Sequence, residues 1–179
     1  MAAGHESSEA AWLHGHAHEP NPLPPGGDGD FVVRVPGREE FRFTVAALAR
    51  LPYTEIEGCL IVSTGHGTSG PFTFGGVRLD ALLAHVLGSA EGLAAGQAAG
   101  QAAGPEHWQY ADVISADGFG TRLTPVDLAN LTSGRPALLA WQRDGQPLTR
   151  AQGLVRLVVP DEHDDALRQV KWIARIEIA

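Results

Sequence analysis

The stretch from Arg143 to Ile178 constrains the fold most, because its pattern predicts two strands that enclose an acidic loop. Asp144-Gly145 between apolar runs is typical of a hairpin turn. Residues 153–160, GLVRLVVP, are largely apolar and β-branched and end at a proline, which favours a buried strand. Residues 170–178 alternate in character and predict the closing strand of the chain.

The closing strand is expected to turn successive side chains to opposite faces. One face would carry Val170, Trp172, Ala174, Ile176 and Ile178, and the other Lys171, Ile173, Arg175 and Glu177. Cations also flank the loop between the two strands, with Arg156 before it and Arg168 and Lys171 after it. We therefore expect a corner that is able to hold an anion.

Lys171 is the only lysine among 13 basic residues, and the other 12 are arginines. Together with 22 glycines, this usage is typical of a GC-rich, bacterial genome. If codon usage alone explains this lysine, Lys171 is a solvated residue on a strand face. A compact ammonium, which the planar fork of arginine cannot imitate, would instead be kept for a specific contact. The residues by themselves leave both interpretations open.

The length of 179 residues suits one domain with a real hydrophobic core. No run approaches the roughly 18 apolar residues of a membrane helix, and the N-terminus lacks the pattern of a secretory signal. We expect a soluble, cytoplasmic protein with no membrane partner. The single cysteine excludes an internal disulfide and a cysteine-rich zinc site.

The net charge of −8 is concentrated at the start of the chain, where residues 1–30 hold five acids and no lysine or arginine. The rest is nearly balanced, so the chain has no general electrostatic footprint for nucleic acid. Residues 1–29 are polar, rich in histidine and closed by a proline-glycine run, which predicts a disordered tail. Its histidines could capture a transition metal, but they lack an enclosing shell of ligands.

Residues 30–179 are expected to form a single domain in which short strands alternate with short helices. Strands are predicted at 31–35, 40–44, 55–63, 72–77, 108–115, 120–123, 136–142, 153–160 and 170–178, and helices at 45–50, 78–87 and 126–131. A loop rich in glycine and hydroxyl groups separates two of the strands at 64–71, and residues 88–104 are a low-complexity insertion. This order is neither a βαβ repeat nor a helical bundle, and it indicates an α+β domain rich in β-structure.

The ordered segments resemble those of the oxidoreductase molybdopterin-binding domain, the catalytic module of the sulfite oxidase superfamily. They are FTVAALARLP (43–52), FGGVRLDALL (74–83), VISADGF (113–119), LLAWQRDGQPL (138–148), GLVRLVVP (153–160) and QVKWIARIE (169–177). The resemblance implies the sulfite oxidase type of fold around a molybdenum–molybdopterin cofactor, a pyranopterin. It further implies an oxidoreductase that acts on a small oxo-compound, with a possible redox partner protein.

The resemblance also implies roles for individual residues. Arg156 matches the arginine of a G-x-P-x-R-type strand and Lys171 the lysine of a V-K-W strand, and both would bind the phosphate of the cofactor, together with Arg168. The segment Ser63, Thr64, Gly65 and His66 would line the site, where His66 would donate to an anion or carry a proton. Cys59 would ligate molybdenum through its thiolate.

Three departures from the family pattern support an alternative. Leu154 stands where the family has proline, and the loop Asp161–Asp165 is acidic and free of glycine. The resemblance implies that the ligand position is Ser63 or Thr64, and Cys59 lies four residues before Ser63, about 13 Å along an extended strand. The alternative is a cofactor-free binding module of the same fold that recognises a small anion or a protein partner.

Overall fold

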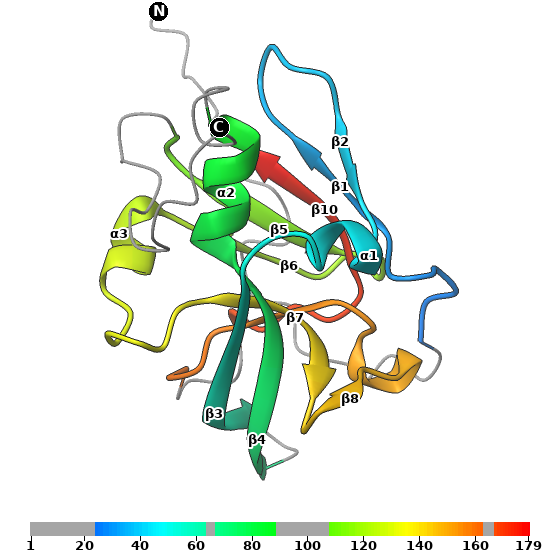
Figure 1. Cartoon of the computed structure of the whole chain (residues 1–179), viewed down its shortest axis with the longest axis vertical. Coiled ribbons are helices and arrows are strands. Elements are labelled where there is room, and N and C mark those ends of the chain that lie inside the picture. The colour runs from blue at the N-terminus through cyan, green and yellow to red at the C-terminus, as the bar shows by residue number, and fades with distance from the viewer. Residues whose placement is uncertain (1–23, 64–66, 89–107, 163–166) are drawn as a thin grey trace, which may run out of the picture.

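The computed structural model of the chain describes residues 24–63, 67–88, 108–162 and 167–179. Within them the strands form two five-stranded sheets (Figure 1). The first sheet has the order β2-β1-β10-β5-β6. Its strands are β1 (Phe31–Arg34), β2 (Phe41–Phe43), β5 (Ala111–Ser115), β6 (Gly120–Leu123) and β10 (Ile173–Ile178). The end of the chain thus pairs with its beginning, because β10 lies parallel to β1 and antiparallel to β5.

The second sheet is built on a long hairpin of β3 (Tyr53–Ser63) and β4 (Gly67–Arg78). β4 continues the sheet to β7 (Leu138–Arg143), which pairs with both β8 (Gln146–Pro147) and β9 (Arg156–Val158). The predicted turn at Asp144-Gly145 therefore joins β7 to β8. The predicted strand at 136–142 is also confirmed, since β7 occupies the centre of this sheet.

Short helices connect the strands, and a threonine occupies the N-cap of three of them. The helices are α1 (Val45–Leu48), α2 (Leu79–Leu87), α3 (Pro125–Ala129) and the 3-10 helix η2 (Arg150–Gln152). The hydroxyl of Thr44 accepts a hydrogen bond from the N–H of Ala47 at 3.0 Å. Thr124 and Asp127 cap α3 reciprocally, and Pro125 occupies the first turn. Each cap satisfies backbone donors that a helix start otherwise leaves unpaired.

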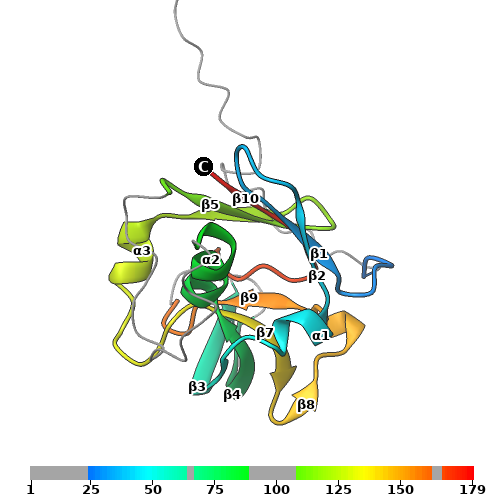
Figure 2. The ribbon, with the colours of Figure 1, turned by 45° about the horizontal axis from the view of Figure 1, so that its top comes forward.

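The main core lies between the sheets, with α2 inside it (Figure 2). Leu79, Leu82, Leu83 and Val86 of α2 are fully buried against residues of both sheets. A smaller cluster covers the opposite face of the second sheet and includes Cys59, Phe74, Ala140 and Val158. Because side chains alternate along a strand, β7 contributes to both clusters.

Two segments differ from the pattern read from the sequence. β4 begins at Gly67, so the second half of the predicted loop at 64–71 is strand. The strict alternation predicted for 170–178 is wrong, because Ile173 is 2% exposed and the pairing with β5 shifts register between Ile173 and Arg175. A bulge adds one unpaired residue and moves the following side chains to the other face.

The predicted tail and insertion lie mostly outside the described residues. Residues 24–27 are described, and Arg150 donates from Nη1 to the carbonyl oxygens of Pro25 and Gly27, each at 2.6 Å. This end of the predicted tail thus lies against η2. No helix in the described parts is long and apolar enough to cross a bilayer.

Candidate functional site

The two segments on either side of the acidic loop lie side by side. The N–H of Leu157 donates to the carbonyl oxygen of Val170 at 2.8 Å, and the N–H of Ile173 to that of Val155 at 3.2 Å. This pairing confirms that the chain returns along β9 after the loop. It brings Lys171, which follows the loop, close to Arg156 of β9, which precedes the loop.

The backbone of this corner is unusual, since three of its residues have positive φ. The values are 112° for Gly153, 55° for Leu154 and 49° for Trp172. A proline could not stand at Leu154, because its ring holds φ near −65°. A proline here would therefore require a different backbone. A side chain at Gly153 would place its Cβ 3.0 Å from the Cβ of Lys171, so a larger residue at position 153 would crowd the lysine side chain.

Arg156 is the centre of the corner. It lies on the face of the second sheet turned away from α2, and it is 6% exposed. Its Nη2 donates to Oε1 of Gln169 at 3.3 Å, and its Nη1 to the carbonyl oxygen of Gln152 at 3.5 Å. Its guanidinium lies 5.5 Å from the centre of the Phe74 ring. Its Nε is one of two buried side-chain nitrogens without a hydrogen-bond partner in the described chain.

Among the described residues, the guanidinium of Arg156 therefore has neutral acceptors only. No carboxylate within the described residues forms an ion pair with it. Burial, aided by the charge of Arg143, lowers the pKa of Arg156 to about 10, so it is still charged at neutral pH. A buried charge with an unsatisfied donor is unfavourable, and a bound anion would satisfy both its charge and its N–H.

Two further cations complete the group that we call the cationic corner, Arg143, Arg156 and Lys171. The guanidinium of Arg143 lies 4.5 Å from the centre of the Phe72 ring, and its Nε is 3.6 Å from Asp144 Oδ2. The ammonium of Lys171 lies 4.7 Å from the Trp172 ring centre. Partial burial and then the charge of Arg156 lower the pKa of Lys171, against the opposing effect of Asp117.

The third cation predicted for this corner, Arg168, is directed elsewhere. Its Nη1 lies 3.7 Å from Asp127 Oδ1 of α3, and its backbone N–H donates to Glu162 Oε2 at 3.0 Å. Its predicted contact with a cofactor phosphate stays a prediction. The next residue, Gln169, reaches Arg156 instead.

The acidic loop is only partly described, and its described acids contact other cations. Asp161 pairs with Arg135 at 2.7 Å, and Glu162 accepts the N–H of Arg168. His163, Asp164 and Asp165 lie outside the described residues. Arg135 therefore offsets the negative charge of Asp161.

Cys59 has the surroundings of a core residue. It is fully buried in the smaller cluster, and its Sγ donates to the carbonyl oxygen of Ile56 at 3.5 Å. Burial raises the pKa of the Cys59 thiol, which favours the protonated form over the thiolate that a metal binds. Its role as a molybdenum ligand stays a prediction.

Of the predicted site-lining segment, the structure describes only the backbone of Ser63. Ser63 ends β3, whereas Thr64, Gly65 and His66 lie outside the described residues. Among the residues that the structure does describe, no group of three or more His, Cys, Asp and Glu side chains is placed to hold a metal ion.

Sequence reasoning missed three residues of the corner, namely Phe74, Arg143 and Gln169. All three lie in segments that resemble the family, and Phe74 and Arg143 are directly opposite each other in the β4–β7 pairing. No local pattern marks Gln169. The signal would have to come from the pairing of the segments around the loop, which only the fold reveals.

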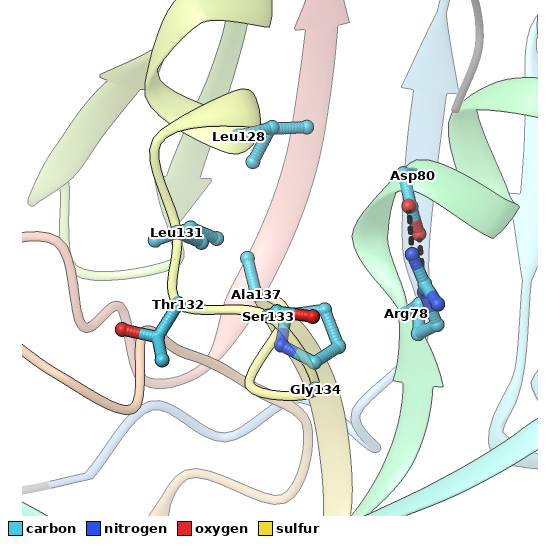
Figure 3. Close-up of a pocket in the computed structure, with 9 residues that line it drawn as sticks. Arg78, Asp80, Leu128, Leu131, Thr132, Ser133, Gly134 and Ala137 are labelled. Atoms are coloured by element: carbon cyan, nitrogen blue, oxygen red, sulfur yellow. Dashed lines mark hydrogen bonds and ion pairs between the residues drawn. The ribbon is translucent and has the colours of Figure 1, made fainter. Parts of the chain in front are cut away.

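A separate pocket of about 240 Å³ lies between the start of α2 and the segment 131–137 (Figure 3). Arg78 and Asp80 form a two-point ion pair at one side of it, with Arg78 Nε 2.9 Å from Asp80 Oδ1. Leu128, Leu131 and the polar turn Thr132-Ser133-Gly134 line the other side. No residue of the cationic corner lines this pocket.

Comparison with known proteins identifies both a family and a fold. The sequence model of the family described as the oxidoreductase molybdopterin binding domain matches residues 21–179. The sulfane dehydrogenase SoxCD from Paracoccus pantotrophus has a similar structure, with a TM-score of 0.55 at 19% sequence identity. The similarity covers 83% of this chain and 37% of that one, so this chain spans much less than the whole of that protein. No curated protein sequence matches the chain significantly.

Proposed function

Because the chain belongs to the oxidoreductase molybdopterin-binding domain family, we propose that it holds a molybdenum–molybdopterin cofactor at its cationic corner and acts as an oxidoreductase on a small oxo-compound. The main support for this proposal is the state of Arg156: its guanidinium is buried and charged, and its Nε has no hydrogen-bond partner among the described residues. A cofactor phosphate fits this position, because it supplies negative charge and acceptor oxygens together.

Each cation of the corner has a distinct part in this proposal. Arg156 supplies the buried N–H groups, and Lys171 supplies a compact charge at the solvent side of the corner. Arg143 adds a third positive charge from the β7–β8 hairpin. The predicted lining of the reaction site is Ser63, Thr64, Gly65 and His66, with His66 as the donor or proton carrier.

The bound cofactor would supply the electron-transfer chemistry, while the protein binds and orients it. The electrons must then pass to or from another molecule, and a redox partner protein is our expectation. In the present arrangement Cys59 does not fit the role of a metal ligand, because its thiol is buried and donates to a backbone carbonyl.

The test is the molybdenum and pterin content of the full chain purified from a host that makes molybdopterin. We expect near-stoichiometric molybdenum and pterin in the native chain, and loss of both in Arg156→Met and Lys171→Met. Arg175→Met is the matched control, because Arg175 is a partly exposed arginine of β10 that pairs with Glu177 at 3.0 Å. Folded native protein without either component would contradict the proposal, as would equal loading of all four proteins.

The burial of Cys59 favours a second candidate function, a module that binds a small anion without molybdenum. A Cys59→Ala variant tests in the same experiment whether Cys59 ligates molybdenum. Loss of molybdenum with pterin retained would identify Cys59 as the ligand. A native chain that carries neither component, but gains thermal stability from phosphate through Arg156, would support the anion-binding module.

A further inference from the structure

We propose that Gln169 is a positioning residue that orients Arg156 without neutralising it, and so makes the corner selective for anions. This inference rests on the proposed anion site. It concerns a residue that is not itself expected to touch the ligand. Gln169 is 6% exposed and lies between the acidic loop and Lys171.

Both ends of the Gln169 amide have partners that determine its orientation. Its Oε1 accepts from Arg156 Nη2 at 3.3 Å, and its Nε2 donates to the carbonyl oxygen of Val159 at 3.5 Å. The reversed amide would direct its N–H groups at the guanidinium and its oxygen at a carbonyl, which places donors against donors and acceptors against acceptors. The amide oxygen therefore faces Arg156 and orients its guanidinium group.

The chemical identity of residue 169 determines the charge that remains for a ligand. A glutamate has nearly the same shape as glutamine, and at this position it would form a charge-assisted hydrogen bond with Nη2. Such an internal ion pair would supply the counter-charge that the described chain otherwise lacks at Arg156. With glutamine, the hydrogen bond is made and no described residue compensates the positive charge.

Two described carboxylates act on the other two cations of the corner. Asp144 lies 3.6 Å from Arg143, and Asp117 raises the pKa of Lys171. Arg156, the most buried of the three, has no carboxylate partner among the described residues. This distribution favours a compact, doubly charged group such as a phosphate monoester, which could contact the buried guanidinium and remain close to Lys171.

The experiment compares the binding of inorganic phosphate by the native full chain, Gln169→Glu, Gln169→Met and Arg156→Met. Calorimetric affinity and the melting temperature are measured with phosphate, and with chloride at equal ionic strength. We expect the ion pair with Arg156 in Gln169→Glu to outweigh the hydrogen bond to Val159 that this variant loses, so that it melts at a higher temperature than the native chain without phosphate. We also expect it to bind phosphate at least about tenfold more weakly, since its own carboxylate occupies Arg156.

Gln169→Met removes the orienting hydrogen bond and leaves the charge. Its phosphate affinity is expected between that of the native chain and that of Arg156→Met. A merely structural role for Gln169 would make affinity and melting temperature fall together in both variants. The charge-selecting role makes them move in opposite directions in Gln169→Glu.

The outcomes separate this inference from the proposed function. If phosphate does not stabilise the native chain through Arg156, the anion site itself is refuted. If the native chain binds phosphate and Gln169→Glu binds it equally well, only the role of Gln169 is refuted. A Gln169→Glu variant that is less stable than the native chain would also overturn it, because an ion pair with Arg156 would then not outweigh the lost hydrogen bond to Val159.

Discussion

Arg156 shows how a single residue can favour ligand binding at the expense of fold stability. Its side chain is almost fully buried, and its hydrogen bonds at 3.3 and 3.5 Å are long. Desolvation of a charge costs several kcal/mol, and neutral acceptors recover only part of that cost. The unfavourable term remains in the free protein and is relieved when an anion binds.

Replacing Arg156 by methionine should therefore leave the free energy of unfolding unchanged or raise it by up to about 4 kcal/mol at neutral pH, in the absence of added anions. Methionine keeps the apolar stem that packs beside Phe74 and removes the buried charge. Urea unfolding of the native chain and the variant in chloride buffer measures this difference. A loss of more than about 1 kcal/mol would mean that Arg156 already has a counter-charge in the folded protein.

The same pair of proteins gives a pH dependence. The folded pKa of Arg156, about 10, lies well below the ordinary value of an arginine. Below about pH 10 both folded and unfolded states carry the proton, so the penalty is fully present. Between the two values the folded state releases its proton first, and stability rises with pH. The advantage of Arg156→Met over the native chain should accordingly shrink above pH 10.

At the scale of elements, β4 owes its central position to two adjacent glycines. Tyr53 lies over Gly75, with its hydroxyl 2.9 Å from Oε1 of Gln142 on β7. A Cβ at Gly76 would meet the carbonyl oxygen of Leu139 and lie 2.7 Å from the Cα of Ala140. The Phe74-Gly-Gly-Val77 motif is thus required by the close approach of the β4 and β7 backbones.

Gly76→Ala should lower the free energy of unfolding by about 1–3 kcal/mol or more, because the β4–β7 backbones would have to separate. Thermal or urea unfolding measures the loss. Gly26→Ala is the control, since a Cβ at Gly26 would have no neighbour within 4 Å. Equal stability of the two variants would show that β4 and β7 are further apart than the structure places them.

Periodic elements could be predicted from the sequence, whereas their deviations could not. α2 was predicted within one residue, because Leu79, Leu82, Leu83 and Val86 share one helical face. The bulge at Ile173 follows from pairing with β5, and no property of residues 170–178 alone requires it. For the same reason Arg156 and Lys171 could be proposed from the family pattern, but Gln169 and the position of Arg168 could not.

At the scale of the whole molecule, α2 joins the two sheets into one structure. The main core includes Val33 and Ile176 of the first sheet and Leu139 and Leu157 of the second, with Leu82 of α2 between them. The first sheet includes both the start and the end of the described chain. The corner that carries Arg156 therefore depends on packing that extends across the molecule.

Leu82→Ala should lower the free energy of unfolding by about 2–5 kcal/mol, because it leaves a cavity where two sheets and a helix meet. Leu167→Ala is the matched control, since Leu167 is 45% exposed and should cost little. Both are measured by urea unfolding. A small loss at Leu82 would show that the sheets can close around the missing side chain.

The contacts of Arg150 have a practical consequence for shortening the chain. Its side chain holds the carbonyl oxygens of Pro25 and Gly27, and its own carbonyl oxygen accepts the indole N–H of Trp172 at 2.6 Å. Trp172 follows Lys171 in the chain. The first described residues therefore support the segment that carries Lys171, through Arg150 and Trp172. A trimmed protein for crystallisation or binding work should therefore begin at or before Pro24. A start at Asp30 would remove two acceptors from Arg150 and loosen the support beneath Trp172.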